Sequence, residues 1–211
     1  MDVNKLWDQL IHAVMTCNKC QLCRTRTRSV PGEGNRDADL MFIGEGPGHD
    51  EDLSGRPFVG RAGQLLDKMI EAIGQKRQDV YIANIVKCRP PGNRVPMEIE
   101  AEACLPYLRR QVYLVRPRII VCLGATAVRY VIDRKVGITR IRGQWFERKG
   151  YWIMATYHPA ALLRDPAKKY EAWEDFKMIR DKINELGPKP EIWYKSAESA
   201  GENNVNNPDN E

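Results

Sequence analysis

The sequence has no apolar run of the roughly 18 residues that a membrane-spanning helix needs. Its first residues, MDVNKLWDQLIHAVM, alternate polar and apolar side chains and lack a cleavage-site pattern, so we expect no secretory signal. No segment repeats along the chain. We therefore expect neither a membrane protein nor a secreted one, and predict a cytoplasmic globular protein.

Charge and composition are unexceptional. The 211 residues include 33 Lys or Arg and 28 Asp or Glu, which leaves a formal net charge of +5. Hydrophobic residues make up 43% and charged residues 29%, as in globular proteins with a core of their own. The length predicts one domain. A charge of +5 is compatible with nucleic-acid binding but does not require it.

Strand-like apolar runs alternate with helical patterns along the chain. Strands are predicted at residues 40–43, 80–86 and 119–123, and in two shorter pieces within 143–156. Helices are predicted at 3–14, 65–73, 99–114, 125–132 and 167–186. Pro106 should bend or interrupt the third of these helices. The alternation predicts an α/β domain with a mainly parallel sheet over residues 1–190, and a disordered polar tail over 191–211.

Four loops follow the predicted strands: GEGPGHDED, KCRPPGNR, LGAT and YHPAALLR. Ligands of α/β sheets bind beyond the carboxyl ends of the strands, so we expect these loops to share one face. The glycine-rich segment that begins with the first loop is too long for a simple turn, and long ordered loops are usually functional. It lacks the G-x-G-x-x-G pattern and the Lys of a phosphate-binding loop, so it is a weak nucleotide signature.

Six cysteines stand at positions 17, 20, 23, 88, 104 and 122. A chain of this length without an export signal favours metal or cluster ligation over disulfides. Cys17 and Cys20 form a C-x-x-C pair, whereas the distant Cys88 and Cys104 are not spaced as in a zinc ribbon. Zinc, an iron–sulfur cluster and simple burial of the distant pair all remain open. Cys122 lies in an apolar strand and is predicted to be core; Cys23 could substitute for a ligand but is predicted to be spare.

Three other side chains, in or near these loops, could have either a chemical or a structural role. His158 can donate a hydrogen bond near neutral pH, or hold a loop in place. Phe58 offers a stacking surface or a core side chain, and the amide of Asn84 suits the edge of a base or a buried hydrogen bond. An acidic group could bind a metal, although a solvated loop is the simpler interpretation: Glu45, Asp50, Glu51 and Asp52.

These motifs occur together and in order. The chain reads C-x-x-C-x-L-C-x-x-R, GEGPGHDEDLSGRPFVGRAGQLL, NIVKCRPPGNRVP, VCLGATA and HPAALLR, over roughly residues 5–186. In these motifs it resembles the family 4 uracil-DNA glycosylases, the iron–sulfur type of thermophilic bacteria and archaea. The resemblance implies a three-layer α/β/α sandwich around a mainly parallel four-stranded sheet, a [4Fe–4S] cluster, and base excision repair of uracil in DNA.

The resemblance assigns the cluster to Cys17, Cys20, Cys88 and Cys104, and leaves Cys23 without a role. Such a cluster would tie the N-terminal segment to the loop after the second predicted strand. We therefore expect a structural role for it, in which it positions loops that bind DNA.

The resemblance also implies contacts with the base. Phe58 would stack on the flipped uracil, which offsets part of the unstacking free energy. Asn84 would donate to O4 and accept from N3–H, a polarity that cytosine reverses. His158 would donate a hydrogen bond to O2 of the departing uracil anion, a contact typically worth roughly 3 kcal/mol. Gly46 would line the uracil site where family 1 enzymes have an Asp.

With Gly46 in that place, another carboxylate must stabilise the sugar cation, or the enzyme must work without one. Glu51 is the first candidate and Glu45 the second. Glu51 could instead shape the pocket against the 5-methyl group of thymine. No Lys lies at a recognised nucleophile position, so hydrolysis should leave an abasic site without a lyase step.

DNA contacts are implied around these loops. Leu162 and Leu163 follow His158 and are expected to supply a minor-groove wedge, with one of the two in the core. Backbone contacts are expected from Lys87, Arg89, Asn93, Arg94 and Arg164.

The expected partner is uracil-containing DNA, single- or double-stranded, bound by a monomer. No sliding-clamp motif is readable. No Arg- and Lys-rich insertion follows GRPFVGRAG, as it would in a related group that links covalently to DNA. A non-catalytic iron–sulfur module that binds nucleic acid or transfers electrons is the alternative.

Overall fold

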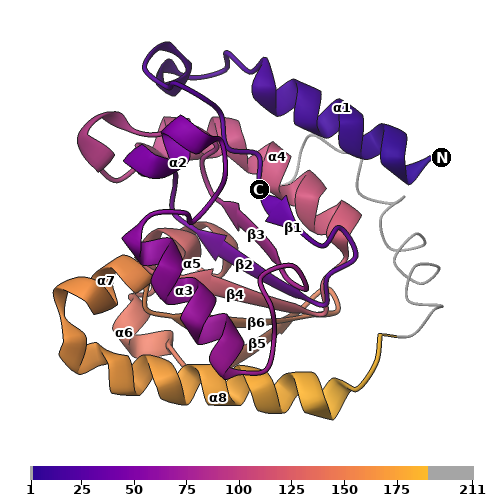
Figure 1. The fold of residues 1–211 in the computed structure, drawn as a ribbon, viewed down its shortest axis with the longest axis vertical. Helices are drawn as coiled ribbons and strands as arrows, with labels where there is room; N and C mark the ends of the chain where they lie inside the picture. Colours follow the sequence, from indigo (N-terminus) through magenta and orange to yellow (C-terminus); the bar gives the residue numbers. More distant parts are fainter. Residues whose placement is uncertain (1, 190–211) are drawn as a thin grey trace.

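The computed structural model of the chain describes residues 2–189. They form a sheet with helices on both faces (Figure 1). The strands are β1 (Glu33–Gly34), β2 (Leu40–Gly44), β3 (Tyr81–Asn84), β4 (Ile119–Leu123), β5 (Trp145–Arg148) and β6 (Tyr151–Thr156). Their order across the sheet is β1-β3-β2-β4-β6-β5.

The helices follow the predicted alternation and add short ones. The α-helices are α1 (Val3–Met15), α2 (His49–Ser54), α3 (Arg61–Ala72), α4 (Glu98–Val115), α5 (Ala125–Val131), α6 (Ile138–Ile141), α7 (Pro159–Arg164) and α8 (Lys169–Leu186). The 3₁₀ helices are η1 (Gln21–Arg24), η2 (Pro91–Asn93) and η3 (Pro166–Lys168). Sequence analysis missed α2 and α6 because helices this short show no apolar periodicity.

Pro106 lies within α4, which continues through it. The prediction that it could interrupt the helix is therefore wrong. The side chain of Pro106 is exposed, while neighbours such as Cys104, Leu105 and Leu108 are buried. Packing of this buried face outweighs the one backbone hydrogen bond that a proline removes.

The four strands at the centre of the sheet are parallel, as predicted. β2 pairs in parallel with β3 and β4, and β4 pairs in parallel with β6. The four strands implied by the resemblance are corrected to six in the described chain, because β1 and β5 add antiparallel edges; the pattern within residues 143–156 predicts β5 together with β6. β1 has two residues, too few to leave a pattern in the sequence. β5 joins β6 through Lys149 and Gly150, both with positive φ, as two-residue hairpins require.

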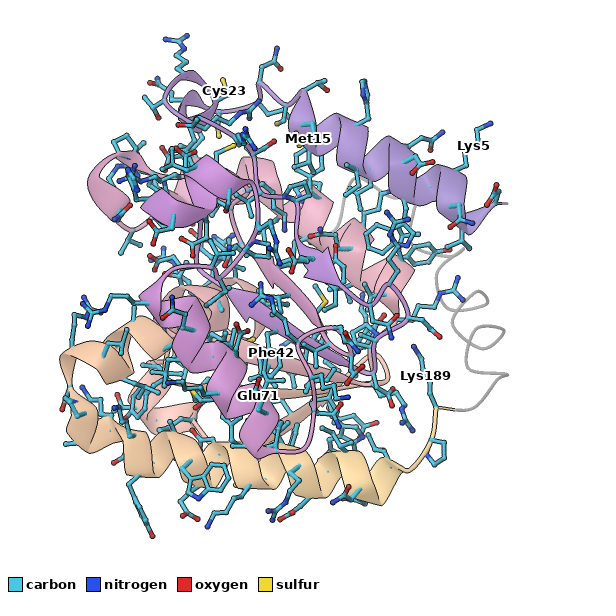
Figure 2. All side chains as sticks on the ribbon, viewed as in Figure 1. Lys5, Met15, Cys23, Phe42, Glu71 and Lys189 are labelled. Atoms are coloured by element: carbon cyan, nitrogen blue, oxygen red, sulfur yellow. The ribbon has the colours of Figure 1, made fainter. Side chains whose placement is uncertain are left out.

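Alternate residues of the buried strands divide the core into two layers. Met41, Ile43 and Ile120 face one layer, which α1, α4 and α5 cover. The other layer is covered by α3 and α8, and there Phe42 stacks on Phe176 with ring centroids 5.9 Å apart. Figure 2 shows Phe42 at the middle of the sheet. Both faces are buried, so these strands are continuous apolar runs without alternation.

Among the described residues, no helix is long and apolar enough to cross a membrane. The tail predicted over residues 191–211 lies outside the described part of the chain.

A buried carboxylate joins α8 to the end of β6. Asp175 is fully buried, and its Oδ2 accepts a hydrogen bond from Thr156 Oγ1 at 2.7 Å. The guanidinium of Arg142 donates to both carboxylate oxygens, at 3.1 Å and 2.5 Å. Because Thr156 is the last residue of β6, this network holds the strand end from which the Tyr157-His158 loop begins.

We expect Asp175→Ala to lower the free energy of unfolding by about 3–5 kcal/mol, because it leaves a largely buried guanidinium without its partner. Urea denaturation measures this. The control is Glu174→Ala, which removes only the half-exposed ion pair to Lys177 and should change stability by less than about 1 kcal/mol. Equal effects of the two substitutions would contradict this account of the network.

Candidate active site

Four loops meet at one edge of the sheet, as the sequence predicts. From β2 the chain first adds β3 on one side and later β4 on the other. The direction in which strands are added to the sheet therefore reverses between β2 and β4. Open α/β sheets bind ligands at such a switch point. Here Thr126, in the first turn of α5, donates a hydrogen bond to Glu45, in the loop after β2.

Gly44, the last residue of β2, makes room for two of the predicted site residues. A Cβ atom built on Gly44 would lie 2.4 Å from Asn84 Oδ1 and 2.6 Å from Phe58 Cζ. Real side chains do not approach so closely. The absence of a side chain at Gly44 therefore allows the amide of Asn84 and the ring of Phe58 to meet at one point.

Asn84 ends β3 and is 2% exposed. Its backbone carbonyl accepts a hydrogen bond from Lys87 Nζ at 2.8 Å. Its side-chain oxygen, Oδ1, is buried and has no hydrogen-bond donor among the described residues. A buried acceptor without a partner costs about 1–3 kcal/mol. Such a group is satisfied when a ligand brings an N–H to it.

Phe58 has a φ of 50°, unusual for a bulky residue, and surrounding contacts hold it there. Gly63 of α3 approaches so closely that a Cβ on it would lie 1.9 Å from Phe58 O. Arg77 donates to Phe58 O at 3.1 Å and to Pro57 O at 2.5 Å. The Phe58 ring stacks on His158, with centroids 5.4 Å apart and planes at 29°.

His158 is the N-cap of α7, and its Nδ1 accepts a hydrogen bond from the Ala160 N–H at 3.1 Å. An Nδ1 that accepts must be unprotonated, so the neutral ring carries its proton on Nε2. Burial and, to a smaller extent, the charge of Arg164 lower the pKa of His158 to about 4, although the charge of Glu51 acts in the opposite direction. The site thus holds a neutral imidazole with one N–H free to donate.

The two candidate carboxylates differ in their contacts. Glu51 accepts from the backbone N–H of Gly48 at 3.0 Å, of Val59 at 2.8 Å and of Gly60 at 2.9 Å. Oε1 therefore holds the loop that carries Phe58, while Oε2 caps the N-terminus of α2 at Gly48. Glu45 instead lies at the switch point, where Thr126 donates to one of its oxygens.

Gly46 lies against a rigid neighbour. A Cβ on Gly46 would lie 2.7 Å from Cγ2 of Val86, a side chain with little rotational freedom. An Asp at this position would displace the chain after β3.

Five cysteines line one cavity between the end of α1, η1 and the start of α4: Cys17, Cys20, Cys23, Cys88 and Cys104. The four predicted ligands are therefore brought together, and Cys23 joins them. Cys122 is apart from them, fully buried in β4 as predicted. The sequence left open that Cys23 could substitute for a ligand, and its place on the cavity agrees with that alternative.

A set of thiol donors such as this one suits a zinc ion or an iron–sulfur cluster. Four thiolates at ~2.3 Å from one zinc lie about 3.8 Å from one another. Among the described residues, no three His, Cys, Asp or Glu side chains are arranged to hold a single metal ion. An iron–sulfur cube binds each thiolate through a different iron, which spreads the sulfurs apart.

Basic groups surround this cavity. Arg26 Nη1 donates to Cys88 Sγ at 3.1 Å, and the Lys87 N–H donates to Cys104 Sγ at 3.3 Å. Burial raises the pKa of Cys104 to about 11, which the positive charge of Lys87 partly offsets. Cationic groups close to thiols favour the thiolate form that a metal binds.

Lys87 does not reach the surface, so its assignment as a DNA contact is wrong. It is 1% exposed, and its ammonium donates to Asn84 O at 2.8 Å and to Gln111 Oε1 at 2.6 Å. Burial lowers the pKa of Lys87 to about 8. Its position after a strand in a basic loop suggested a phosphate contact, but the chain turns this side chain inward.

The other side chains expected to contact DNA differ in how far they are exposed. Leu162 is 1% exposed and belongs to the core, whereas Leu163 is 38% exposed. One of the two was expected in the core, and the assignment of Leu162 to DNA is wrong. Arg164 is exposed.

Side chains of the basic loop after β3 form hydrogen bonds within the loop and to α4. Arg89 Nε donates to Asn93 Oδ1 at 2.7 Å. Arg94 donates with two nitrogens to the buried Glu100, at 2.7 Å and 2.8 Å. The positive charge of Arg94 is therefore already paired with the carboxylate of Glu100 on α4.

The sequence did not single out Arg77, and it offered Asp52 only as a member of an acidic group that could bind a metal. Asp52, buried on α2, accepts from the Thr27 N–H at 2.9 Å and so ties α2 to the cysteine segment. Arg77 stands in a polar turn with no local pattern. Thr126 had a signal that could have been used, because it directly follows a strand in LGAT.

Comparison with known proteins places these features in a family. The family model of the Uracil DNA glycosylase superfamily matches residues 31–177. A Type-4 uracil-DNA glycosylase of Archaeoglobus fulgidus is 45% identical over 189 residues, 86% of this chain and 95% of that protein.

Two further relatives have the same printed name. The protein of Sulfurisphaera tokodaii is 47% identical over 184 residues, 82% of this chain and 83% of its own length. That of Saccharolobus solfataricus is 44% identical over 186 residues, 84% of this chain and 86% of its own.

We expect Glu51→Ala to loosen the Phe58 loop. The substitution removes the acceptor of three backbone N–H groups. Hydrogen bonds to a charged acceptor contribute about 1.5–3 kcal/mol each, so local opening at Val59 and Gly60 should become easier by about 2 kcal/mol or more. Native-state hydrogen exchange at these amides measures the change.

The control is Asp50→Ala, on the exposed side of the same short helix. It should leave exchange at Val59 and Gly60 close to that of the unmodified protein. If Glu51→Ala also left these two rates unchanged, Glu51 would not be what holds the loop.

Proposed function

The chain belongs to the uracil-DNA glycosylase superfamily, and we propose that it releases uracil from DNA with the side chains gathered at the carboxyl edge of its sheet. The reaction is hydrolysis of the bond between base and deoxyribose, which leaves an abasic site. The observation that supports this site best is the unpaired, buried Oδ1 of Asn84.

Recognition of uracil falls to Asn84. Its buried oxygen accepts from N3–H of uracil, and the amide nitrogen donates to O4. Cytosine has an acceptor at N3 and a donor at N4, so it would leave the buried oxygen unpaired and face the amide nitrogen with another donor. Lys87 fixes the backbone from which this amide projects, because its ammonium holds Asn84 O.

Phe58 receives the flipped base. A base must leave the helical stack to be excised, which costs a few kcal/mol, and stacking on an aromatic ring offsets part of that. The strained φ of Phe58 is held from three sides, by Gly63, Arg77 and the Glu51-bound loop. The ring is thus in position before the base arrives.

His158 stabilises the leaving group. Negative charge develops on uracil as the bond breaks, and the neutral imidazole donates its Nε2–H to O2. A donor already oriented at the developing charge needs no reorganisation in the transition state. The Ala160 N–H, bound to Nδ1, keeps the proton on Nε2.

The carboxylates take separate roles. We assign the electrostatic role toward the sugar cation to Glu45, which directly follows Gly44 and is oriented by Thr126. Glu51 positions the Phe58 loop, which reverses the order of preference drawn from the sequence. Lys87 is buried and hydrogen-bonded to the backbone, which fits an enzyme without a lyase step.

The cysteine cavity would hold a [4Fe–4S] cluster on Cys17, Cys20, Cys88 and Cys104. When bound, such a cluster supplies a rigid multi-point crosslink. It would join the segment after α1 to the loop after β3 and to α4. It would also restrain Asn84 through Lys87, whose backbone N–H donates to Cys104 Sγ and whose ammonium donates to Asn84 O. Anaerobic purification followed by iron and acid-labile sulfide analysis tests it.

The DNA-facing surface would comprise Leu163, Arg164, Arg89 and Asn93. Leu163 projects from α7 beside His158 and can fill the space that the flipped nucleotide leaves. The protein would act as a monomer on single- or double-stranded DNA.

We expect His158→Ala to reduce the rate of uracil release about a hundredfold, the effect of losing one oriented donor to a developing charge. Single-turnover release from a uracil-containing oligonucleotide measures it. The control is His49→Ala, because His49 is exposed on α2, and its rate should match the unmodified protein. Full activity of His158→Ala would contradict the role of His158, and no release by the unmodified chain would favour a non-catalytic module.

The same assay across pH tests the state of the imidazole. Because the pKa of His158 is lowered from 6.5 to about 4, the ring is already neutral above about pH 5. No inflection of kcat/KM near pH 6.5 should come from His158, and the loss of Nδ1 as an acceptor should begin only near pH 4. An inflection near 6.5 that His158→Ala abolishes would contradict this assignment.

Substitution of two adjacent leucines, one exposed and one buried, distinguishes a loss of DNA contact from a loss of stability. Leu163→Ala should lower activity on double-stranded DNA more than on single strands and leave stability nearly unchanged. Leu162→Ala should lower the free energy of unfolding by about 2–5 kcal/mol, as for other buried leucines. Oligonucleotide assays and urea denaturation measure both; the reverse pattern would refute the wedge.

A further inference from the structure

The cavity contains one thiol more than a four-cysteine cluster needs. Cys23 lies beside the four ligands assigned above: Cys17, Cys20, Cys88 and Cys104. Figure 2 shows Cys23 in the loop that follows α1. Among the described residues, Cys122 is the one cysteine outside this group, because it is buried within the sheet.

Cys20 and Cys23 flank one turn of the chain. Cys20 is the N-cap of η1, and Cys23 lies within that 3₁₀ helix. The Cys23 N–H donates to Cys20 O at 3.3 Å, which closes one turn. Cys20 itself has an extended backbone (φ −146°, ψ 170°), so it is the cavity lined by both residues that brings the two thiols together.

The cavity is more accessible on its η1 side. The guanidinium of Arg26 lines the same cavity as Cys23 and donates a hydrogen bond to Cys88 Sγ at 3.1 Å. Cys17, Cys20 and Cys23 are half-buried, whereas Cys88 and Cys104 are buried. Ligand exchange is therefore easiest on the η1 side, where solvent can carry a proton.

We propose that Cys23 is a reserve ligand, which takes over the iron of Cys20 when that thiolate is lost. The inference rests on the proposed [4Fe–4S] cluster. In the exchange the iron–sulfur bond to Cys20 breaks and a bond to Cys23 forms. Cys23 gives up its thiol proton and Cys20 takes one from solvent. No iron changes its oxidation state, so neither oxidant nor reductant is needed.

The experiment compares full-length variants purified anaerobically with the unmodified holoprotein. The test variants are Cys20→Ala, Cys23→Ala and the double variant. Cys17→Ala and Cys104→Ala are controls, because η1 places no spare thiol three residues from either. Iron and acid-labile sulfide per chain report the cluster, and mass spectrometry after iodoacetamide treatment reports which cysteines are protected.

Cys20→Ala and Cys23→Ala should each retain most of the iron, while the double variant and both controls lose most of it. Cys23 should be alkylated in the unmodified holoprotein and protected in Cys20→Ala. This change in protection is independent of catalytic activity.

Several results would overturn the proposal. If Cys20→Ala loses as much iron as Cys104→Ala, Cys23 is not a reserve ligand. A double variant that keeps its cluster shows that Cys23 is not the replacement, and iron loss in Cys23→Ala makes it an ordinary ligand. Retention by Cys17→Ala in place of Cys20→Ala would refute the pairing with Cys20. An unmodified protein without iron refutes the cluster itself, which is a separate failure.

Discussion

The parallel pairing of β2 with β3 on one side and β4 on the other is the constraint on which the site depends. Parallel strands end at the same edge, so loops far apart in the chain begin next to each other. Gly44, at the end of β2, then decides what can fit between them. Its missing side chain allows Asn84, from β3, and Phe58, from the loop after β2, to approach one point. His158, from the end of β6, closes the other side of the Phe58 ring.

Buried polar groups connect this pocket with the cysteine cavity. The buried ammonium of Lys87 donates to Asn84 O and to Gln111 Oε1, and the backbone N–H of Lys87 donates to Cys104 Sγ. One residue therefore touches both a proposed cluster ligand and the backbone of the residue that reads uracil. Among the polar groups that connect the two sites, the side-chain oxygen of Asn84 is buried without a donor from the described residues; Trp7 Nε1, on α1, is the other buried side-chain atom without a hydrogen-bond partner in that part of the chain. That contrast marks Asn84 as the group that awaits a ligand.

The loop that carries Phe58 has little regular structure, so charged side chains hold it through its backbone. Glu51 gathers three N–H groups, and Arg77 caps two carbonyls. Hydrogen bonds to charged groups are about twice as strong as neutral ones, which lets a few of them maintain a strained φ at Phe58. These residues shape the site without reaching the base, and catalysis is left to groups such as His158 and Glu45.

The sequence by itself determined the parallel α/β core, since long apolar runs alternate with helical patterns, and it placed the four loops at one edge. Its ordered motifs also singled out Asn84, Phe58 and His158, because each stands next to a strand end or in the glycine-rich segment. It could not decide which way a side chain turns within a loop. Lys87 points inward and Leu162 packs into the core, while Cys23 reaches the cavity of the other cysteines. Those outcomes depend on contacts between segments distant in the chain, and only the tertiary structure brings these segments together.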